Sequence, residues 1–586
     1  MKNLFRVLRF FWVDTPLILL VLVLLGLSTG LNLLKPWPLA LIVDSLLNNK
    51  PWPAWMASWV GGWGKQGMLV ILSLVILLVY FLQAGLSTVQ NYLVIKVGLR
   101  GLARVRNRLF HWLARLSLRY YQGARQGDVI YRAAWDTYSF QTLFQHGLFN
   151  FVTACLSLGL MVAVMWQLNR LLTFFALGTV PLLLIAMRVL GRKMSRQSLA
   201  AHQADSRVTS QVQQTISAMP LIQSCTQEAG EERQYASQVA RALRARLSQH
   251  GWEVVYLAAI GVVFGLGVGG IAWMGAQQVW QGRLTIGELL VFLAYLGQFY
   301  DPLNQLSRMG ATLAEANAGT KRVFEILDTP VEVIELPSAK AAVPGAISFD
   351  AVSFGYEPRR LVLGSITFEI PAGHATALVG PSGAGKSTLL HLLPRFFDPL
   401  KGAVRLNGVD LRELRLNELR SRISLVMQEP LLMPGTVAEN IAYGRPNATL
   451  DEIQTAARAA HADEFIQQLP EKYTTLVGEG GSRLSVGEKQ RLSLGRAFLK
   501  KCASPDSREP TGSLDAESEA LVNASLEELM RGRTTLIATH RPGILRQVDQ
   551  VIVLEGGLMA EMGTPAELIQ RGGYFARVFG ARLHLP

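Results

Sequence analysis

Six long apolar stretches constrain this chain more than any other feature of its sequence. Each approaches or exceeds the roughly 20 residues that a helix needs to cross a bilayer. The last two contain several glycines or polar residues, but glycine is common in membrane helices, so we expect helices there too. The sequence therefore predicts six membrane spans rather than the buried helices of a soluble protein. They lie near residues 16–44, 67–88, 149–166, 171–190, 254–276 and 286–307.

The composition agrees with a membrane protein. Half of the 586 residues are hydrophobic and 17% are charged, whereas ordinary soluble domains carry about 25% charged residues. The three cysteines, Cys155, Cys225 and Cys502, are isolated in the sequence and lack the spacing of a metal site. They do not form a disulfide framework, and a reducing cytosolic face suits at least the last two.

The basic residues indicate how the chain is oriented. Residues 96–132 and 188–250 are dense with Arg and Lys, and residues 2–9 are basic as well, while the connections 167–170 and 277–285 are nearly uncharged. Loops rich in basic residues stay on the cytoplasmic side, which places the N-terminus and both long loops there. The net charge of +14 is then a sign of orientation and of attraction to anionic lipids. We expect no nucleic-acid partner.

The composition changes after about residue 325. The long cytoplasmic loops before that point have a helical pattern, so the predicted spans continue past the membrane as rods. A linker over 326–344 precedes a segment in which short apolar strands alternate with helices, which is typical of an α/β domain. The sequence predicts a multidomain membrane protein: an all-α transmembrane domain over 1–325, the linker, and an α/β domain over 345–586.

A glycine-rich loop follows the apolar strand HATALVG and precedes the helix STLLHLLPRF. Strand, loop and helix in this order are the context of a P-loop, whose backbone N–H groups and helix N-terminus bind phosphate. Lys386 is expected to reach the β- and γ-phosphates, and Ser387 to bind magnesium. The sequence thus predicts a nucleotide site. Its loop residues are Gly380, Pro381, Ser382, Gly383, Ala384, Gly385, Lys386, Ser387 and Thr388.

Other residues occur where a nucleotide could reach them. Tyr356, about one strand upstream of the loop, could stack on adenine or simply pack on the core. Gln428 and His540 each follow an apolar strand, where a polar side chain can face the γ-phosphate. The segment LSVGEKQR places Ser485 and Gly487 at what could be another phosphate-facing helix start or a solvated, charged one.

Taken in order, these motifs resemble the ABC transporter superfamily, and more closely its multidrug and lipid exporters, in which six spans precede one ATPase domain. The resemblance covers nearly the whole chain. It implies that Tyr356 stacks on adenine, that Gly380 to Thr388 form the Walker A loop, and that Ser387 and Gln428 bind Mg²⁺. The further roles that it implies are the signature motif (Ser485 and Gly487), the general base (Glu509), the D-loop aspartate (Asp515) and the switch histidine (His540).

The resemblance implies ATP-driven export of a hydrophobic or amphipathic substrate, drug-like or lipid-like, by alternating access. One Walker A and one signature per chain require a dimer, and a homodimer is the default. Half of a heterodimer with an impaired site, or an ATP-gated regulator with little turnover, are the alternatives. The expected location is a bacterial inner membrane, in contact with lipid, with the N-terminus and ATPase domain in the cytoplasm.

Some segments of the predicted membrane domain have expected roles of their own. The helical tips near 126–137 and 217–228 resemble coupling helices, which pass motion from the ATPase domain to the spans. Polar residues at membrane depth could line a cavity or join helices by hydrogen bonds, and we favour the second reading. They are Gln83, Asn91, Gln298, Asp301 and Asn304.

Two motifs depart from the family pattern. The signature has Val486 and Glu488 where glycine and glutamine are usual, but it keeps Ser485 and Gly487. The strand before Glu509 reads Ser-Pro-Asp-Ser, although a central parallel strand is normally apolar and proline loses a ladder hydrogen bond.

The residue just before Glu509 is the more serious departure. Arg508 replaces the aspartate that directs magnesium, and its repulsion from a divalent ion 4 Å away would be ~8 kcal/mol at an effective dielectric of 20. A degenerate ATPase site would explain this. A compensated frameshift over 502–508 would explain it too, because another reading frame can encode Ile-Leu-Asp-Glu there.

Overall fold

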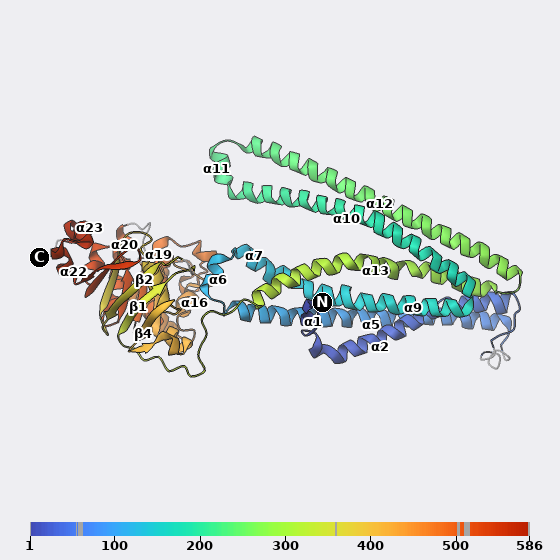
Figure 1. Cartoon of the computed structure of the whole chain (residues 1–586), viewed down its shortest axis with the longest axis horizontal. Helices are drawn as coiled ribbons and strands as arrows, with labels where there is room; N and C mark the ends of the chain where they lie inside the picture. The colour runs from blue at the N-terminus through green and yellow to red at the C-terminus, as the bar shows by residue number, and fades with distance from the viewer. Residues whose placement is uncertain are drawn as a thin grey trace. The chain divides into compact units, whose positions relative to one another are not determined.

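The computed structural model describes residues 2–53, 56, 63–357, 360–500, 504–508 and 516–583. Two compact units are present (Figure 1). The first comprises Met1–Ala114 and Gly127–Asp328, and the second comprises Arg115–Gln126 and Thr329–Pro586. A short piece from the first half of the sequence therefore belongs to the second unit.

The first unit is helical wherever it has regular structure (Figure 1). Its long helices are α2 (Thr15–Leu34), α5 (Lys65–Leu113), α9 (Asn150–Leu168), α10 (Arg170–Ser217), α12 (Glu228–Trp280) and α13 (Ile286–Leu327). Shorter ones are α1 (Lys2–Leu8), α3 (Trp37–Leu41), α7 (Gln126–Tyr131), α8 (Tyr138–Thr142) and α11 (Met219–Ser224).

Several helix starts follow directly from the sequence. Thr285 and Glu288 form a reciprocal capping box at the start of α13, which satisfies two of the free N–H groups there. Asn169 caps α10 by accepting a hydrogen bond from the Leu172 N–H at 3.1 Å. These caps fix where the chain turns back after the short connections 167–170 and 277–285.

Five helical stretches in the described part of the chain are long and apolar enough to cross a membrane. In the most apolar part of α5 only 6% of the residues are buried inside the protein, as suits side chains that face lipid. The helix over the sixth predicted span, α13, carries Gln298, Asp301 and Asn304 and is not among the five. The five are Trp12–Leu47, Lys65–Leu113, Gln126–Leu168, Arg170–Ser217 and Glu228–Trp280.

Polar side chains join helices within the apolar core of this unit. Asn32 donates to Gln298 at 3.1 Å, and the Tyr256 hydroxyl donates to Asn304 at 3.3 Å. The prediction that polar residues at membrane depth bridge helices is therefore confirmed for Gln298 and Asn304. Among the described residues, the other three, Gln83, Asn91 and Asp301, make no such side-chain hydrogen bond.

The N-terminal segment is anchored on α5. Asp14 is 4% exposed and forms ion pairs with Arg100 and Arg104, and the Arg104 side chain also donates to the Phe10 carbonyl at 2.7 Å. The buried Phe11 ring lies over Gly101, where an added Cβ would come within 2.1 Å of it. A glycine at this point in α5 allows the close approach.

The second unit contains two sheets (Figure 1). The antiparallel sheet has the order β2 (Leu363–Ile370), β1 (Ile347–Phe354), β4 (Lys401–Leu406), β5 (Val409–Asp410). The larger sheet has the order β10 (Leu558–Gly563), β9 (Gln550–Glu555), β3 (Ala375–Val379), β8 (Thr535–Ala538), β7 (Ser504–Arg508), β6 (Ile423–Val426). All its pairs are parallel except β10 with β9.

Helices flank these sheets. The apolar core between the helices and the larger sheet includes β3, whose five residues are all buried. The helices are α14 (Lys386–Leu392), α15 (Leu416–Arg422), α16 (Val437–Ala442), α17 (Leu450–Ala459), α18 (Asp463–Gln468), α19 (Val486–Lys500), α20 (Ala516–Met530), α21 (Pro542–Leu545), α22 (Pro565–Arg571) and α23 (Tyr574–Leu583).

The segment from the first half of the sequence contributes α6 (Leu118–Gly123) to the second unit. Leu118 packs on the apolar core of this unit, and Arg119 forms an ion pair with Glu332 at 3.4 Å. A helical tip was predicted at 126–137, whereas the segment that belongs to the second unit is Arg115–Gln126. The prediction was therefore wrong by about ten residues, because helical periodicity does not show which surface a helix contacts. The second predicted tip, 217–228, contains α11, the turn between α10 and α12 (Figure 1).

Candidate functional site

The predicted phosphate loop lies between β3 and α14 in the expected order. Two of its glycines have positive φ and no room for a side chain. A Cβ on Gly380 would lie 2.1 Å from the Leu554 carbonyl oxygen, and one on Gly385 would lie 2.6 Å from the Leu363 side chain. The loop can therefore adopt this path only with glycine at these two positions.

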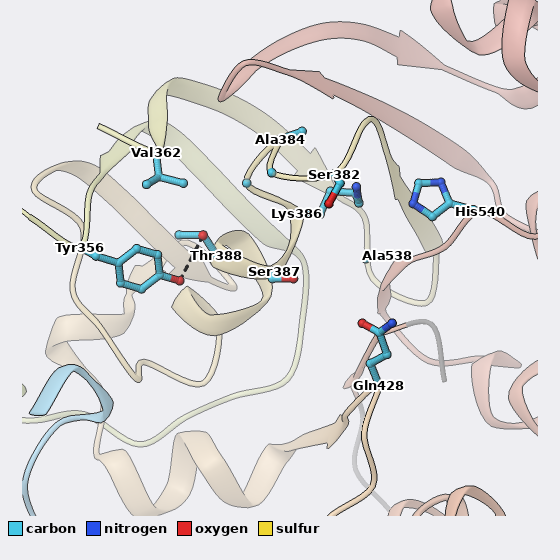
Figure 2. A pocket seen from close by; sticks show the side chains of 12 residues that line it. Tyr356, Val362, Ser382, Ala384, Lys386, Ser387, Thr388, Gln428, Ala538 and His540 are labelled. Carbon is cyan, nitrogen blue, oxygen red and sulfur yellow. Dashed lines mark hydrogen bonds between the residues drawn. The ribbon is translucent and has the colours of Figure 1, made fainter. Parts of the chain in front are cut away.

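The loop opens onto a pocket of about 440 Å³ (Figure 2). The pocket brings together side chains that are far apart in the sequence, including most of those predicted from the motifs. Gly380 and Pro381 are not among the residues that line it. The lining residues are Tyr356, Val362, Ser382, Gly383, Ala384, Gly385, Lys386, Ser387, Thr388, Gln428, Ala538 and His540.

The Lys386 side chain is hydrogen-bonded to the backbone of its own loop. Its ammonium donates hydrogen bonds to the carbonyl oxygens of Gly380 at 2.7 Å and Pro381 at 2.9 Å. The positive charge is thus fixed beside the backbone N–H groups of the loop and the N-terminus of α14, both of which favour an anion. The arrangement suits a polyphosphate.

Tyr356 lies just beyond β1 on the rim of the pocket (Figure 2). Its ring makes edge contacts with Phe354 and Phe397, at centroid distances of 5.2 and 5.5 Å, and its hydroxyl lies 3.2 Å from the Thr388 hydroxyl. Both readings of this residue thus have support, because the ring packs on the core and also borders the pocket. A half-buried, oriented ring can stack on a planar base.

Gln428 and His540 follow β6 and β8. Because the carboxyl ends of parallel strands meet at one edge of a sheet, both side chains reach the pocket from the same edge (Figure 2). Both are exposed. The Ser387 hydroxyl and the Gln428 amide supply hard oxygen donors beside the loop, and such donors fit Mg²⁺.

The strand β7 approaches the same pocket. Its backbone pairs with β6 and β8, with Pro505 opposite Ser424 and Arg508 opposite Ala538. Since Ala538 lines the pocket, the end of β7 lies where a residue that directs magnesium is expected. The next residue, Glu509, and also Asp515 lie outside the described residues.

Ser485 and Gly487 do not line this pocket and mark the start of α19 instead. The Ser485 N–H donates to the Glu488 carboxylate at 2.7 Å, and the Glu488 N–H donates to the Ser485 hydroxyl at 3.3 Å. This is a capping box, so Glu488 has a structural reason to stand where the family usually has glutamine. The Ser-x-x-Glu spacing of this box is a signal that the sequence already contains. Val362 and Ala538, which also line the pocket, gave no sequence signal because both are apolar.

Both units match known families. Residues 18–303 match the ABC transporter transmembrane region, and residues 363–503 match the ABC transporter family model. The chain belongs to the ABC transporter family. It has the exporter-type arrangement of one membrane domain and one ATP-binding domain in a single chain, and it is an integral membrane protein.

Relatives of this ABC transporter extend over most of its length. The ATP-dependent lipid A-core flippase of Desulfotalea psychrophila is 31% identical over 87% of this chain and 90% of its own. The fatty acid ABC transporter ATP-binding/permease protein of Mycobacterium tuberculosis is 34% identical over 81% of this chain and 75% of its own. The structure of a bacterial Atm1-family ABC exporter with ATP bound has a TM-score of 0.78 at 28% identity, covering 98% of this chain and 99% of its own.

Proposed function

We propose that this ABC transporter exports a lipid-like or drug-like amphipathic substrate, driven by ATP. The observation that carries the proposal is a pocket at the glycine-rich loop in the same chain as helices able to cross a membrane. Relatives named for lipid A and for fatty acids favour a lipid-like substrate. The proposed setting is a bacterial inner membrane, with the N-terminus and the ATPase domain in the cytoplasm.

The proposed roles follow the chemistry of the pocket. Lys386 and the loop N–H groups bind the phosphates, Tyr356 orients the base, and His540 contacts the γ-phosphate. Ser387 and Gln428 would hold Mg²⁺, which supplies charge neutralisation at the phosphates. Glu509 is proposed as the base that takes a proton from the attacking water.

The working unit is proposed to be a homodimer. Ser485 and Gly487 lie at the start of α19 and outside the pocket of their own chain, so they would act only on a nucleotide held by a second chain. Asp515 is proposed to lie at the same contact between the two chains. The boundaries 1–325, 326–344 and 345–586 stay predictions.

The decisive experiment reconstitutes the purified chain in liposomes with a fluorescent lipid in one leaflet. We expect slow ATP- and magnesium-dependent movement of the lipid to the other leaflet, inhibited by vanadate and faster in an Arg508→Asp chain. A Lys386→Ala chain serves as the matched control. ATP-independent movement that is equal in both chains would refute export.

A second candidate is half of a heterodimer with an impaired nucleotide site. Arg508 favours this second candidate, because it lies at the end of β7 opposite Ala538, which lines the pocket. In that case the chain alone would bind ATP but transport nothing, and activity would appear only with a co-expressed partner.

A further inference from the structure

A second pocket, separate from the ATP site, lies in the first unit between α1, α5 and α13. Its volume is about 300 Å³, at the lower end of the range for small-ligand sites. Three arginines, three aromatic rings and one carboxylate surround it. The lining residues are Arg6, Arg9, Phe10, Arg108, Trp112, Phe324, Leu327 and Asp328.

The charges in this pocket do not cancel. Arg6 is bound to Asp328 through two hydrogen bonds of 2.9 and 2.6 Å, and its guanidinium lies 4.0 Å above the Phe324 ring. The hydrogen bonds from Arg6 lower the pKa of Asp328, so this carboxylate stays ionised and committed to Arg6. Within the described part of the chain, Arg9 and Arg108 form no ion pair. The pocket therefore has two arginines whose charge is not balanced.

Both arginines are exposed, and they converge on one cavity. Arg9 follows α1, and Arg108 projects from α5 one turn before Trp112, so two separate elements place them around one cavity. Guanidinium groups bind phosphate oxygens through paired N–H donors, and the Trp112 and Phe10 rings line the same cavity.

The N-terminal side of the pocket is close in sequence to the first predicted span. Arg9 is three residues before the apolar stretch Trp12–Leu47, in which the chain enters its first predicted span. Phe5 is 74% exposed and Trp12 is 73% exposed, and aromatic residues of this kind prefer the headgroup level of a bilayer. Free phosphate has no need of this apolar setting, whereas a lipid has acyl chains to place there.

We propose that this pocket binds the phosphate of an anionic phospholipid through Arg9 and Arg108. The acyl chains then extend along the apolar residues at the start of the first span, and the headgroup joins α1 to α5 and α13. Basic pockets at the cytoplasmic side of membrane helices are suited to anionic headgroups. This site is independent of ATP turnover, so its test and the test of export can fail separately.

The experiment is native mass spectrometry of the full-length chain in detergent, titrated with phosphatidylglycerol or with phosphatidylcholine of the same acyl chains. We expect preferential binding of phosphatidylglycerol. The double variant Arg9→Gln/Arg108→Gln should weaken that binding by roughly fivefold for each arginine removed. The variant Arg9→Lys/Arg108→Lys should recover part of it, since the charge remains.

The matched control is Arg241→Gln/Arg244→Gln, which removes the same charge from exposed positions on α12. It should bind phosphatidylglycerol like the unmodified chain. Thermal unfolding of each variant in detergent checks that the fold is kept, and the single variant Arg108→Gln replaces any double variant that does not fold.

Two results would overturn the proposal. If the Arg9/Arg108 and Arg241/Arg244 variants lose affinity equally, then overall charge and not the pocket attracts the lipid. If inorganic phosphate displaces phosphatidylglycerol at comparable concentrations, the pocket serves a soluble phosphate and the lipid assignment is wrong.

Discussion

Lys386 is the residue on which nucleotide binding should depend most directly. Its ammonium is already held against the loop by the Gly380 and Pro381 carbonyls, so little order is lost when phosphate binds. Lys386→Ala should weaken ATP binding by at least about tenfold, because hydrogen bonds to charged groups are worth about 1.5–3 kcal/mol. Titration with a fluorescent ATP analogue measures this. Unchanged ATP binding and turnover would remove the basis for the phosphate-site assignment.

His540 should act differently, since its proposed contact is only with the γ-phosphate. His540→Ala should leave ADP affinity nearly unchanged and slow hydrolysis by about a hundredfold or more. The comparison of ADP binding, ATP binding and turnover in one variant separates these effects. An equal loss of ADP and ATP affinity would contradict a role at the γ-phosphate.

At the scale of elements, the anchor of the N-terminal segment on α5 can be tested with two glycines of the same helix. A Cβ on Gly101 would collide with the buried Phe11 ring, whereas a Cβ on Gly85 meets nothing within 4 Å. Gly101→Ala should therefore destabilise the protein by about 1–3 kcal/mol through overpacking. Gly85→Ala, the control, should be neutral or stabilising, since alanine favours helix. Thermal unfolding in detergent measures both, and equal melting temperatures would contradict the anchor.

The strand β7 contains the residues that depart most from the family pattern, and its position tests a prediction made from the sequence. The position of a strand before Glu509 was predicted from the motif alone, and the backbone pairing of Ser504–Arg508 between β6 and β8 confirms it. The match to the ABC transporter family model ends at residue 503, just before the unusual residues of this strand.

A chain with Arg508 should bind ATP but hydrolyse it slowly, because a cation would stand beside the magnesium. Arg508→Asp should raise magnesium-dependent ATPase activity substantially, while Arg508→Gln, which removes only the charge, should raise it less. Sequencing the gene decides between a degenerate site and a frameshift. Brisk turnover by a chain with verified Arg508 would overturn the impairment.

Much of the candidate site was predictable from the sequence, and the features that were not predicted share a cause. Strand, glycine loop and helix are local patterns, so the phosphate loop and the strand-end residues Gln428 and His540 could be identified. The docking of α6 on the second unit depends on the contact of Leu118 with a core assembled from distant residues, which no local pattern encodes. Gln298 and Asn304 were anticipated as residues that join membrane helices, but their partners, Asn32 and Tyr256, were not.

At the scale of the whole molecule, the predicted topology has a direct test. It places Lys50, in the first connection, outside the membrane, and Cys225, the residue after α11, on the cytoplasmic side. In a Cys155→Ser/Cys502→Ser chain, Cys225 is the sole thiol. Impermeant amine and thiol reagents on intact cells should modify Lys50 and spare Cys225, as read by peptide mass spectrometry. Permeabilised cells are the control, and labelling of Cys225 in intact cells would invert the orientation.

The placement of α6 has a practical consequence for anyone who divides this protein. Residues 115–126 belong physically to the ATPase unit although the membrane-domain segment Gly127–Asp328 separates them from it in the sequence. A fragment starting at Thr329 would leave bare the apolar surface that Leu118 covers. Chimeras that exchange ATPase domains between relatives should therefore exchange α6 together with the domain, because the two segments form one unit although they are separated in the sequence.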